Sequence, residues 1–408
     1  MDKVGMAAIR KNNTQNRILH IIRSKGKVSK MDIKKISRYS MVTVLDTIDA
    51  MVERGLVYYA EKVNTKSGRK PTYITLNPQG GYFLGLSFNA TEITLTMLDF
   101  CGGTLDFEKM TLESRKLSVE YVLGQLYLLL EDMLGRHRDI REKIMGIGVG
   151  TPGYVDELNG LCIFYPHIAQ WQNIPLKALL EERVPDIPIY VENNSNAMAL
   201  AYKWLCPEGA DTTSIIVSIR SGVRMSCLIS NVLYRGKNFT AGEIGHIRVN
   251  GGSRYCPCGK QGCLETEISE KAIVEKILEG VRVNRFINLW EMAGQDETRV
   301  DMNLFIESVR RGHPDSIALL DELCDYLGDT VTQIVNMFNP SNVFFNARIS
   351  DLGDIFYDRM NAIVRERAIF VALDGLTLAP VAFGNKTAAI GAATIVMERE
   401  LSFVDATI

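Results

Sequence analysis

One histidine and three cysteines stand close together in the second half of the chain, in the order H-x9-C-x-C-x4-C. They are His246, Cys256, Cys258 and Cys263, and two glycines between the last two cysteines permit a tight backbone turn. An imidazole and three thiolates are the ligands that a tetrahedral structural zinc site uses. The spacing therefore predicts that these four side chains hold one Zn²⁺ ion.

The alternative interpretation is a chance cluster of buried thiols, because free cysteine is common in protein cores. Three of the eight cysteines lie within eight positions and follow a histidine, which favours the metal site. The other five are scattered singly and are expected to be core thiols: Cys101, Cys162, Cys206, Cys227 and Cys324. Since no signal peptide is recognisable, we expect a reduced, cytoplasmic setting rather than a disulfide framework.

The net charge of −2 hides a strong asymmetry along the chain. Residues 1–80 contain sixteen Lys and Arg against six Asp and Glu, a balance of +10, and the remaining residues carry a balance of −12. A basic module on an acidic body is typical of a protein that binds nucleic acid through that module. The 408 residues suffice for two or three domains, and no apolar run approaches the roughly 20 residues that span a membrane.

The first eighty residues have the pattern of a winged helix-turn-helix. Apolar residues at helical spacing, a plausible N-cap at Ser29 and a stop at Gly55 predict three helices, which two strand-like runs follow. The expected segments are helices over 14–24, 30–36 and 41–54, strands over 56–59 and 72–76, and a basic turn over 64–70. Four residues of the third helix are expected to face inward: Val44, Ile48, Met51 and Val52. Residues 1–80 are therefore predicted to form a DNA-binding domain.

The exposed face of this module predicts contacts with double-stranded DNA. In such modules the outward, N-terminal side of the third helix meets base edges, and basic side chains around it meet phosphates. The expected base-reading residues are Ser40, Met41, Thr43, Asp46 and Thr47. The expected backbone contacts are Lys27, Lys30 and Arg38, together with Arg69 and Lys70 of the turn, which could also enter the minor groove. Each charge alone is more often a solvated surface group, but the set favours DNA.

From residue 81 the chain alternates strand-like and helix-like segments, which is typical of an α/β fold. Strands are expected over 82–86, 93–98, 144–149 and 187–191, with a turn at 102–103 and a helix over 119–135. Pro188 lies near the start of the last of these strands. Because proline cannot donate a hydrogen bond to a central ladder, this strand is expected to begin at the proline or to lie at a sheet edge.

The motif G-E-I-G-H, which ends at His246, and the following C-x-C-G-x-x-G-C-L-E resemble the signature of the ROK family of sugar kinases and sugar-responsive transcription regulators. The resemblance runs from about residue 81 to the C-terminus. It implies a two-lobed, actin-like body over residues 81–408 that binds the effector and forms the oligomer, with the break between lobes near 192–196. The N-terminal module resembles the DNA-binding module of ROK regulators. ROK kinases lack such a module.

The same resemblance implies a sugar site. In the family the glutamate and histidine of E-x-G-H and the glutamate after the last cysteine contact sugar hydroxyls, which points to Glu243, His246 and Glu265 here. Further implied sugar contacts are Asn193, Asn194 and His167. A histidine with one nitrogen on a metal keeps its other N–H to donate, and neighbouring carboxylates can accept from pyranose hydroxyls. The alternative is that His246 is a structural metal ligand only.

The nucleotide side departs from the pattern of ROK kinases at three segments. In the kinases an aspartate precedes a glycine pair in the first strand pair, and Ser87 stands in place of this aspartate here. Arg220 and Arg224 flank the segment that replaces a G-T-G-x-G phosphate loop, and a later glycine pair is replaced by Asn346-Ala347. Arginine could bind phosphate itself, but the loss of glycines that let backbone approach phosphate argues against it.

The catalytic base of the kinases is replaced as well. Asn194 stands where the resemblance expects the aspartate that deprotonates the sugar, and an amide cannot act as a general base. The favoured hypothesis is therefore a homodimeric or homotetrameric DNA-binding regulator, a repressor of carbohydrate-metabolism genes, that senses a sugar or sugar phosphate without catalysis. The alternative is an active ROK sugar kinase with an appended DNA-binding domain, which ATP consumption would reveal. No membrane partner is expected.

Overall fold

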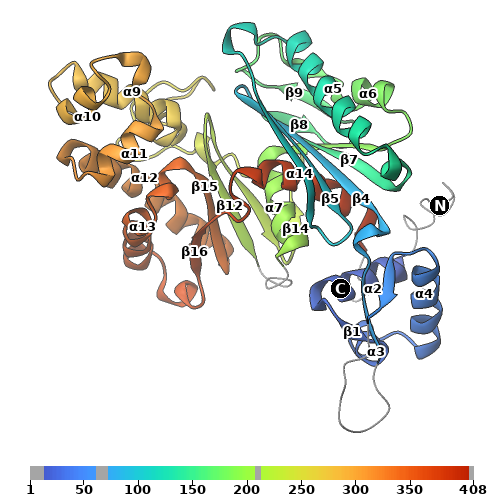
Figure 1. The fold of residues 1–408 in the computed structure, drawn as a ribbon. Helices are drawn as coiled ribbons and strands as arrows, with labels where there is room; N and C mark the ends of the chain where they lie inside the picture. Colours follow the sequence, from blue (N-terminus) through green and yellow to red (C-terminus); the bar gives the residue numbers. More distant parts are fainter. Residues whose placement is uncertain (1–12, 61–71, 207–212, 404–408) are drawn as a thin grey trace. The chain divides into compact units, whose positions relative to one another are not determined.

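The computed structural model describes residues 13–60, 72–206 and 213–403 (Figure 1). The chain divides into unit 1, which comprises Met1–Glu208 and Phe383–Ile408, and unit 2, which comprises Gly209–Ala382. Each unit contains a five-stranded sheet with helices packed on it, so the chain is an α/β protein. Within the described ranges, no helix is long and apolar enough to cross a membrane.

Unit 1 begins with a module of three helices and a small antiparallel sheet. The helices are α2 (Asn13–Lys25), α3 (Lys30–Ser37) and α4 (Met41–Glu53), and the sheet has the order β1 (Val28–Ser29), β3 (Tyr73–Leu76), β2 (Val57–Tyr59). Ser29 caps α3 by accepting a hydrogen bond from the Asp32 amide, and Ser40 caps α4 by accepting from the Thr43 amide. The three predicted helices and two predicted strands are present, and β1 is an additional strand.

The third helix of the module packs largely as expected. Val44, Ile48 and Met51 are buried, whereas Val52 is only half-buried because it lies on the flank of the inward face. Gly55, with φ of +71°, follows the end of this helix in a left-handed conformation that glycine adopts without strain. The predicted basic turn over 64–70 lies outside the described residues, and so do Arg69 and Lys70.

The main sheet of unit 1 has the strand order β11-β7-β4-β5-β6. Its strands are β4 (Tyr82–Phe88), β5 (Glu92–Asp99), β6 (Thr104–Thr111), β7 (Ile144–Thr151) and β11 (Ile189–Asn193). The helices are α5 (Val119–Arg136), α6 (Leu176–Arg183), α7 (Asn194–Leu205) and α14 (Thr387–Leu401), and a smaller sheet contains β8 (Tyr154–Asp156), β9 (Leu161–Phe164) and β10 (Gln172–Ile174). Strand β11 begins directly after Pro188 and lies at the sheet edge, as the proline predicts.

Helix α14 approaches this sheet very closely, and two paired glycines allow it. Gly85 of β4 lies opposite Gly148 of β7 in the sheet register. A Cβ atom at Gly85 would overlap the carbonyl oxygen of Ala389, and one at Gly148 would overlap that of Ala392. The helix backbone therefore rests on the sheet backbone with no side chain between them.

Unit 2 repeats the strand order in its own sheet, β14-β13-β12-β15-β16. The strands are β12 (Ser214–Ile219), β13 (Val223–Ile229), β14 (Val232–Tyr234), β15 (Asn342–Ala347) and β16 (Thr377–Pro380). The helices are α8 (Glu265–Ile268), α9 (Glu270–Val281), α10 (Ile287–Met292), α11 (Met302–Arg310), α12 (Pro314–Phe338) and α13 (Asp354–Arg367). Their buried apolar side chains form one core with the sheet.

The chain passes from unit 1 to unit 2 after residue 208, later than the lobe break expected near 192–196. The reason is helix α7, which begins at Asn194 but packs on α14 within unit 1. A Cβ atom at Gly391 of α14 would lie 2.7 Å from the backbone of Ala197 in α7. This contact keeps the whole helix with the first unit.

Candidate metal and ligand sites

The histidine and three cysteines predicted as metal ligands come together in unit 2. One ligand atom from each of His246, Cys256, Cys258 and Cys263 lies within 4.8 Å of all the others. Cys256 Sγ is 3.7 Å from His246 Nδ1, and Cys258 Sγ is 3.7 Å from Cys263 Sγ. Ligands on a tetrahedral zinc with bonds of about 2.3 Å stand about 3.8 Å apart, so these two distances fit the edges of such a site. The cluster can hold a metal ion.

The local backbone explains why the cysteines converge. The Cys256 amide donates to Lys260 O at 2.8 Å, which closes a tight turn around Cys258. Gly259 and Gly262 have φ of +85° and +78°, in the left-handed region expected from the glycines in the motif. Burial raises the pKa of the Cys256 thiol, and the charge of a bound cation is the means by which a protein makes a thiolate in such surroundings.

Glu243, a predicted sugar contact, faces an arginine of the same unit. Arg224 Nη1 lies 3.0 Å from Glu243 Oε1, and Arg224 Nη2 donates to the carbonyl oxygens of Ala241 at 3.1 Å and Phe239 at 3.4 Å. The ion pair is close but poorly aligned, since Glu243 Oε1 has no hydrogen bond of good geometry among the described residues. Burial raises the pKa of Glu243, and the Arg224 charge opposes that shift.

The two arginines that replace the phosphate loop are both held by groups of unit 2. Arg220 approaches Glu270 Oε1 at 3.4 Å and donates to Asn346 Oδ1 at 3.2 Å. Arg224 is held by Glu243 and two carbonyl oxygens, as described above. Between the arginines, the Val223 amide donates to Glu265 Oε2 at 3.1 Å. The segment is therefore held by carboxylates from later parts of unit 2, and Glu265 ties it to the loop of the metal cluster.

In unit 1, two residues that differ from the kinase pattern bond to each other. Ser87 Oγ donates to Asn194 Oδ1 at 2.9 Å, and Asn194 Nδ2 donates to Phe88 O at 2.9 Å. Asn193 is the N-cap of α7, where its Oδ1 accepts from the Ser195 amide at 2.9 Å and its Nδ2 donates to Gly153 O at 2.8 Å. Both asparagine side chains thus have structural partners at the start of α7.

The remaining predicted sugar contact, His167, is exposed in unit 1 and lies against Tyr165 with 5.1 Å between ring centroids. The predicted sugar residues are thus divided: Asn193, Asn194 and His167 belong to unit 1, and Glu243, His246 and Glu265 belong to unit 2. Within each unit the structure brings together Asn193 with Asn194, and Glu243 and Glu265 with the arginine-containing segment.

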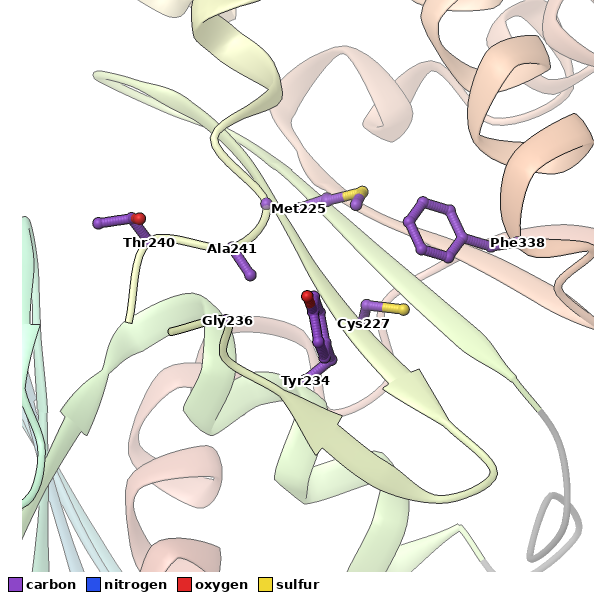
Figure 2. Close-up of a pocket in the computed structure, with 8 residues that line it drawn as sticks. Met225, Cys227, Tyr234, Gly236, Thr240, Ala241 and Phe338 are labelled. Atoms are coloured by element: carbon purple, nitrogen blue, oxygen red, sulfur yellow. The ribbon is translucent and has the colours of Figure 1, made fainter. Parts of the chain in front are cut away.

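A pocket of about 260 Å³ borders the loop that carries Glu243. Figure 2 shows Phe338, at the end of α12, on one side of this pocket and the segment of Gly236 and Ala241 on the other. Met225 and Cys227 of β13 and Tyr234 of β14 complete most of the lining. Sequence reasoning did not predict this pocket, because its wall comes from segments that are far apart in the chain, residues 225–242 and Phe338.

The predicted DNA-contact residues that the structure describes are exposed or half-exposed on the module. Ser40 and Asp46 are exposed, Met41, Thr43 and Thr47 are half-exposed, and Arg38 and Lys27 are exposed beside them. The Thr47 hydroxyl donates to Thr43 O at 2.7 Å, and Lys30 Nζ lies 3.7 Å from Asp49 Oδ1 and 5.1 Å from the Tyr59 ring centroid. Val42, which the sequence analysis did not single out, is 66% exposed at the start of α4.

Comparison with known proteins identifies the family. The family model described as ROK family matches residues 84–399. The chain belongs to the ROK family. A relative, the xylose repressor of Caldicellulosiruptor bescii, is 26% identical over 381 residues, which cover 92% of this chain and 93% of the repressor. The ROK resemblance expected from the metal-loop motif is thus confirmed.

Two solved structures of ROK proteins match the fold. A ROK family transcriptional regulator, described as a homologue of the E. coli MLC protein, matches with a TM-score of 0.81 and 22% identity over 98% of each chain. A ROK glucokinase from Streptomyces griseus in complex with glucose and AMPPNP matches with a TM-score of 0.65 and 25% identity over 77% of this chain and 99% of its own. These matches confirm the predicted fold class, a winged helix-turn-helix followed by a two-lobed, actin-like α/β body.

Proposed function

We propose that this protein is a sugar-responsive, DNA-binding transcriptional regulator that represses carbohydrate-metabolism genes. The observation that carries the proposal is the basic three-helix module that precedes the ROK match at residue 84. The xylose repressor aligns over nearly its full length, whereas the glucokinase leaves about a quarter of this chain unmatched. We assign residues 1–80 to DNA binding and residues 81–408 to effector binding and oligomerisation.

The proposed DNA target is a palindromic operator bound by a homodimer or homotetramer, because two-fold protein symmetry is mirrored in the half-sites. Selection from a random duplex library, followed by footprinting, gives the bound sequence. Thr43→Ala or Thr47→Ala should change which sequences are selected, if these side chains reach base edges. Arg69→Ala should weaken binding to all sequences and flatten its salt dependence. Specific binding by a chain that lacks residues 1–80 would contradict the assignment.

For the effector we propose a sugar or sugar phosphate bound through Glu243, His246 and Glu265, with Asn193, Asn194 and His167 as further contacts. A half-buried carboxylate beside Arg224 and an imidazole held by a metal can accept from and donate to neighbouring hydroxyls. D-xylose, D-glucose, N-acetyl-D-glucosamine and glucose 6-phosphate form a suitable thermal-shift panel. A sugar at 100 times its Kd adds about 2.7 kcal/mol of stability. Glu243→Gln should abolish that shift, whereas Glu279→Gln, at a more exposed ion pair with Arg254, should retain it.

We propose that the ion in the cysteine cluster is Zn²⁺ in a structural role, held by His246, Cys256, Cys258 and Cys263. Three thiolates and one imidazole suit zinc, and a bound ion would fix the loop that carries His246. His246 Nδ1 faces the cluster, which leaves Nε2 for a ligand. Metal analysis should find about one zinc per chain. Cys258→Ser should remove it, and Cys101→Ser, at an exposed cysteine elsewhere, should not. A metal-free protein that still responds to sugar would contradict this proposal.

We propose that the kinase-like body does not catalyse phosphoryl transfer. Asn194 at the position of the general base bonds to Ser87 and Phe88, and Arg224 occupies the segment where kinases have phosphate-loop glycines. The competing function, an active sugar kinase, is favoured by the match to the glucokinase. A coupled assay of sugar-dependent ATP consumption separates the two. We expect no turnover from the unmodified protein or from Asn194→Asp, because the arginines remain.

A further inference from the structure

Three residues of α2 face away from the DNA-binding module and contact the rest of unit 1. Asn16, His20 and Arg23 are spaced i, i+4 and i+7, which places them on one side of the helix. The other side of α2 supplies Ile18 and Ile22 to the core of the module, where both are fully buried. Helix α2 therefore has two separate faces, one for the module and one for the body.

Asn16 and His20 meet the C-terminal end of α14. Asn16 is 3% exposed, and its Nδ2 donates to Glu400 O at 3.2 Å and to Ser402 O at 3.0 Å. These carbonyls belong to the last turn of α14 and the residue that ends it, where helix carbonyls need outside donors. The His20 ring lies 5.4 Å from that of Phe403 and 6.1 Å from that of Trp204, in an edge-on arrangement with Trp204.

Arg23 meets the body at the end of β5 and the end of α7. Its Nη2 donates to Phe100 O at 2.6 Å, and its guanidinium carbon lies 5.7 Å from the Phe100 ring and 6.0 Å from the Trp204 ring. Burial lowers the pKa of Arg23 to about 10, although Cys101 and Asp99 oppose the shift. Because removing a cation from water is costly, this contact opposes part of the free energy gained when the module docks.

Helices α7 and α14, on which the module docks, are joined to each other along their length. Near the start of both helices, Gly391 and Ala197 allow backbone-to-backbone contact. Near their ends, Glu398 accepts from the Trp204 indole at 2.8 Å and forms an ion pair with Lys203 at 2.8 Å. The same Trp204 contacts His20 and Arg23. The two helices can therefore move only as a pair.

The N-terminal end of α7, opposite Trp204, lies at two of the predicted sugar contacts. Asn193 caps the helix, and Asn194 is its first residue. Asn193 bonds to Gly153 O, in the bend between β7 and β8, and Asn194 bonds to Ser87 and to Phe88 O of strand β4. A helix of 12 residues is about 18 Å long, so α7 spans the distance from these asparagines to the docked module.

We propose that α7 and α14 form the connection through which sugar binding at Asn193 and Asn194 changes the position of the DNA-binding module, with Asn16, His20 and Arg23 as positioning residues. This inference rests on the proposed function. A ligand that alters the hydrogen bonds at the start of α7 shifts the helix pair, and the contacts on α2 then favour one pose of the module over another. By linkage, DNA binding changes sugar affinity by the same factor that sugar changes DNA affinity.

The test measures, in the full chain, the factor by which sugar changes the affinity for DNA. Fluorescence anisotropy gives the Kd for a duplex selected by the unmodified protein, without sugar and with saturating D-xylose, D-glucose or N-acetyl-D-glucosamine. Arg23→Met removes the bond to Phe100 O, and His20→Ala removes the ring contacts. In both variants the sugar-free Kd for DNA and the thermal shift with sugar should persist, while the factor, on the order of 5- to 150-fold in allosteric proteins, falls towards one. Arg23→Lys, which keeps a charged donor, should restore part of it.

Arg399→Met is the matched control, because Arg399 lies on α14 but pairs with Glu157 instead of α2. It should keep the full factor. If Arg23→Met and His20→Ala also keep it, the connection through α2 is wrong while the proposed function stands. If none of the three sugars changes the DNA affinity of the unmodified protein, both the sugar response and this connection are wrong. A thermal melt of each variant verifies that a loss of coupling between sugar and DNA does not come from unfolding of the variant.

Discussion

Unit 1 and unit 2 share one sheet topology but pack their helices on it in different ways. In each unit the first three strands of the sheet pair antiparallel with one another. Two later strands then extend the sheet from the free edge of the first strand, and they run parallel to it. In unit 1, Gly85 and Gly148 let the backbone of α14 rest on the sheet. In unit 2 large side chains separate α13 from the sheet, such as Phe345 of β15 and Phe356 of α13, whose rings lie 5.4 Å apart.

This difference suits the two units to different tasks. A contact between backbones has no rotamers that can absorb a displacement, so a shift of α14 and its neighbour α7 is passed on instead of being taken up by side chains. That stiffness is useful in a connection between two sites. Unit 2 instead builds its ligand groups on the loops around the cysteine cluster and the Arg224 segment. In the proposed mechanism, the same topology supports a transmitting element in one unit and a ligand-binding surface in the other.

The largest effect on stability is expected from truncating the aromatic core of unit 2. Phe356 is fully buried, and Phe356→Ala should cost about 3–5 kcal/mol because it leaves a cavity between helix and sheet. Urea unfolding gives the loss, and hydrogen exchange should locate it in unit 2. The matched control is Phe370→Ala in the same unit, where the side chain is 82% exposed and the change should stay within about 0.5 kcal/mol. Equal losses in the two variants would contradict the packing described here.

An intermediate effect is expected at the glycine contact of unit 1. Gly148→Ala places a methyl group on the carbonyl of Ala392, so helix and sheet must separate, at a cost of about 1–3 kcal/mol. Gly124→Ala in α5 is the control, because a Cβ there meets nothing within 4 Å and should add about 0.5–1 kcal/mol to the stability of the helix. The sharper outcome concerns function: Gly148→Ala should also reduce the coupling between sugar and DNA, which anisotropy measures, and Gly124→Ala should not.

The smallest effect is expected from the charge clusters that join helices to each other or to the sheet. Asp106 of β6 lies 2.6 Å from Arg136 Nη1 and 2.9 Å from His137 Nε2. Burial would raise the Asp106 pKa, but the bonds from His137 and the Phe107 amide and the Arg136 charge bring it below its usual value. A lowered folded pKa stabilises the protein above the unfolded pKa of about 3.9, and this contribution is lost as pH falls through the folded pKa.

Asp106→Asn should therefore cost up to about 1 kcal/mol at neutral pH and make stability less dependent on pH below about 4. Its counterpart in unit 2 is Asp325→Asn at the ion pair with Arg367, where the aspartate side chain is 58% exposed. That substitution should change stability by at most a few tenths of a kcal/mol. Urea midpoints measured from pH 3 to pH 7 would distinguish the two, and identical pH profiles would argue against the stronger cluster in unit 1.

Several elements of the fold could be predicted from the sequence because their causes lie within a few residues. Ser29 caps its helix with its own hydroxyl, and the glycines of the metal loop adopt the positive φ that the cysteine spacing requires. The cap that Ser40 forms on α4 was not among the predictions, which placed Ser40 only among the base-reading residues. The strand β11 after Pro188 lies at the sheet edge for a similarly local reason. The short β1 was missed, since two residues carry no detectable period.

The candidate site divides in the same way. The spacing H-x9-C-x-C-x4-C brings the four ligands together because one loop supplies the three thiols and the histidine stands just before it. The sequence showed that Arg224 stands in a segment where ROK kinases have phosphate-loop glycines. It did not show that Arg224 forms an ion pair with Glu243. Whether an arginine in that segment would meet a phosphate or a carboxylate depends on how β13 and the following loop cross, which no local pattern encodes.

The sequence by itself determined the caps and helices of the basic module, the convergence of the cysteine cluster and the family of the body, since each depends on short-range spacing. Only the tertiary structure decided that Ser87 bonds to Asn194 across 107 positions and that Asn16 bonds to the end of α14 across 384. Such contacts follow from the packing of whole helices and sheets, in which a small shift decides whether two polar groups meet. The local sequence thus determines caps, turns and helices, whereas the packing of the folded core determines which distant polar groups bond to each other.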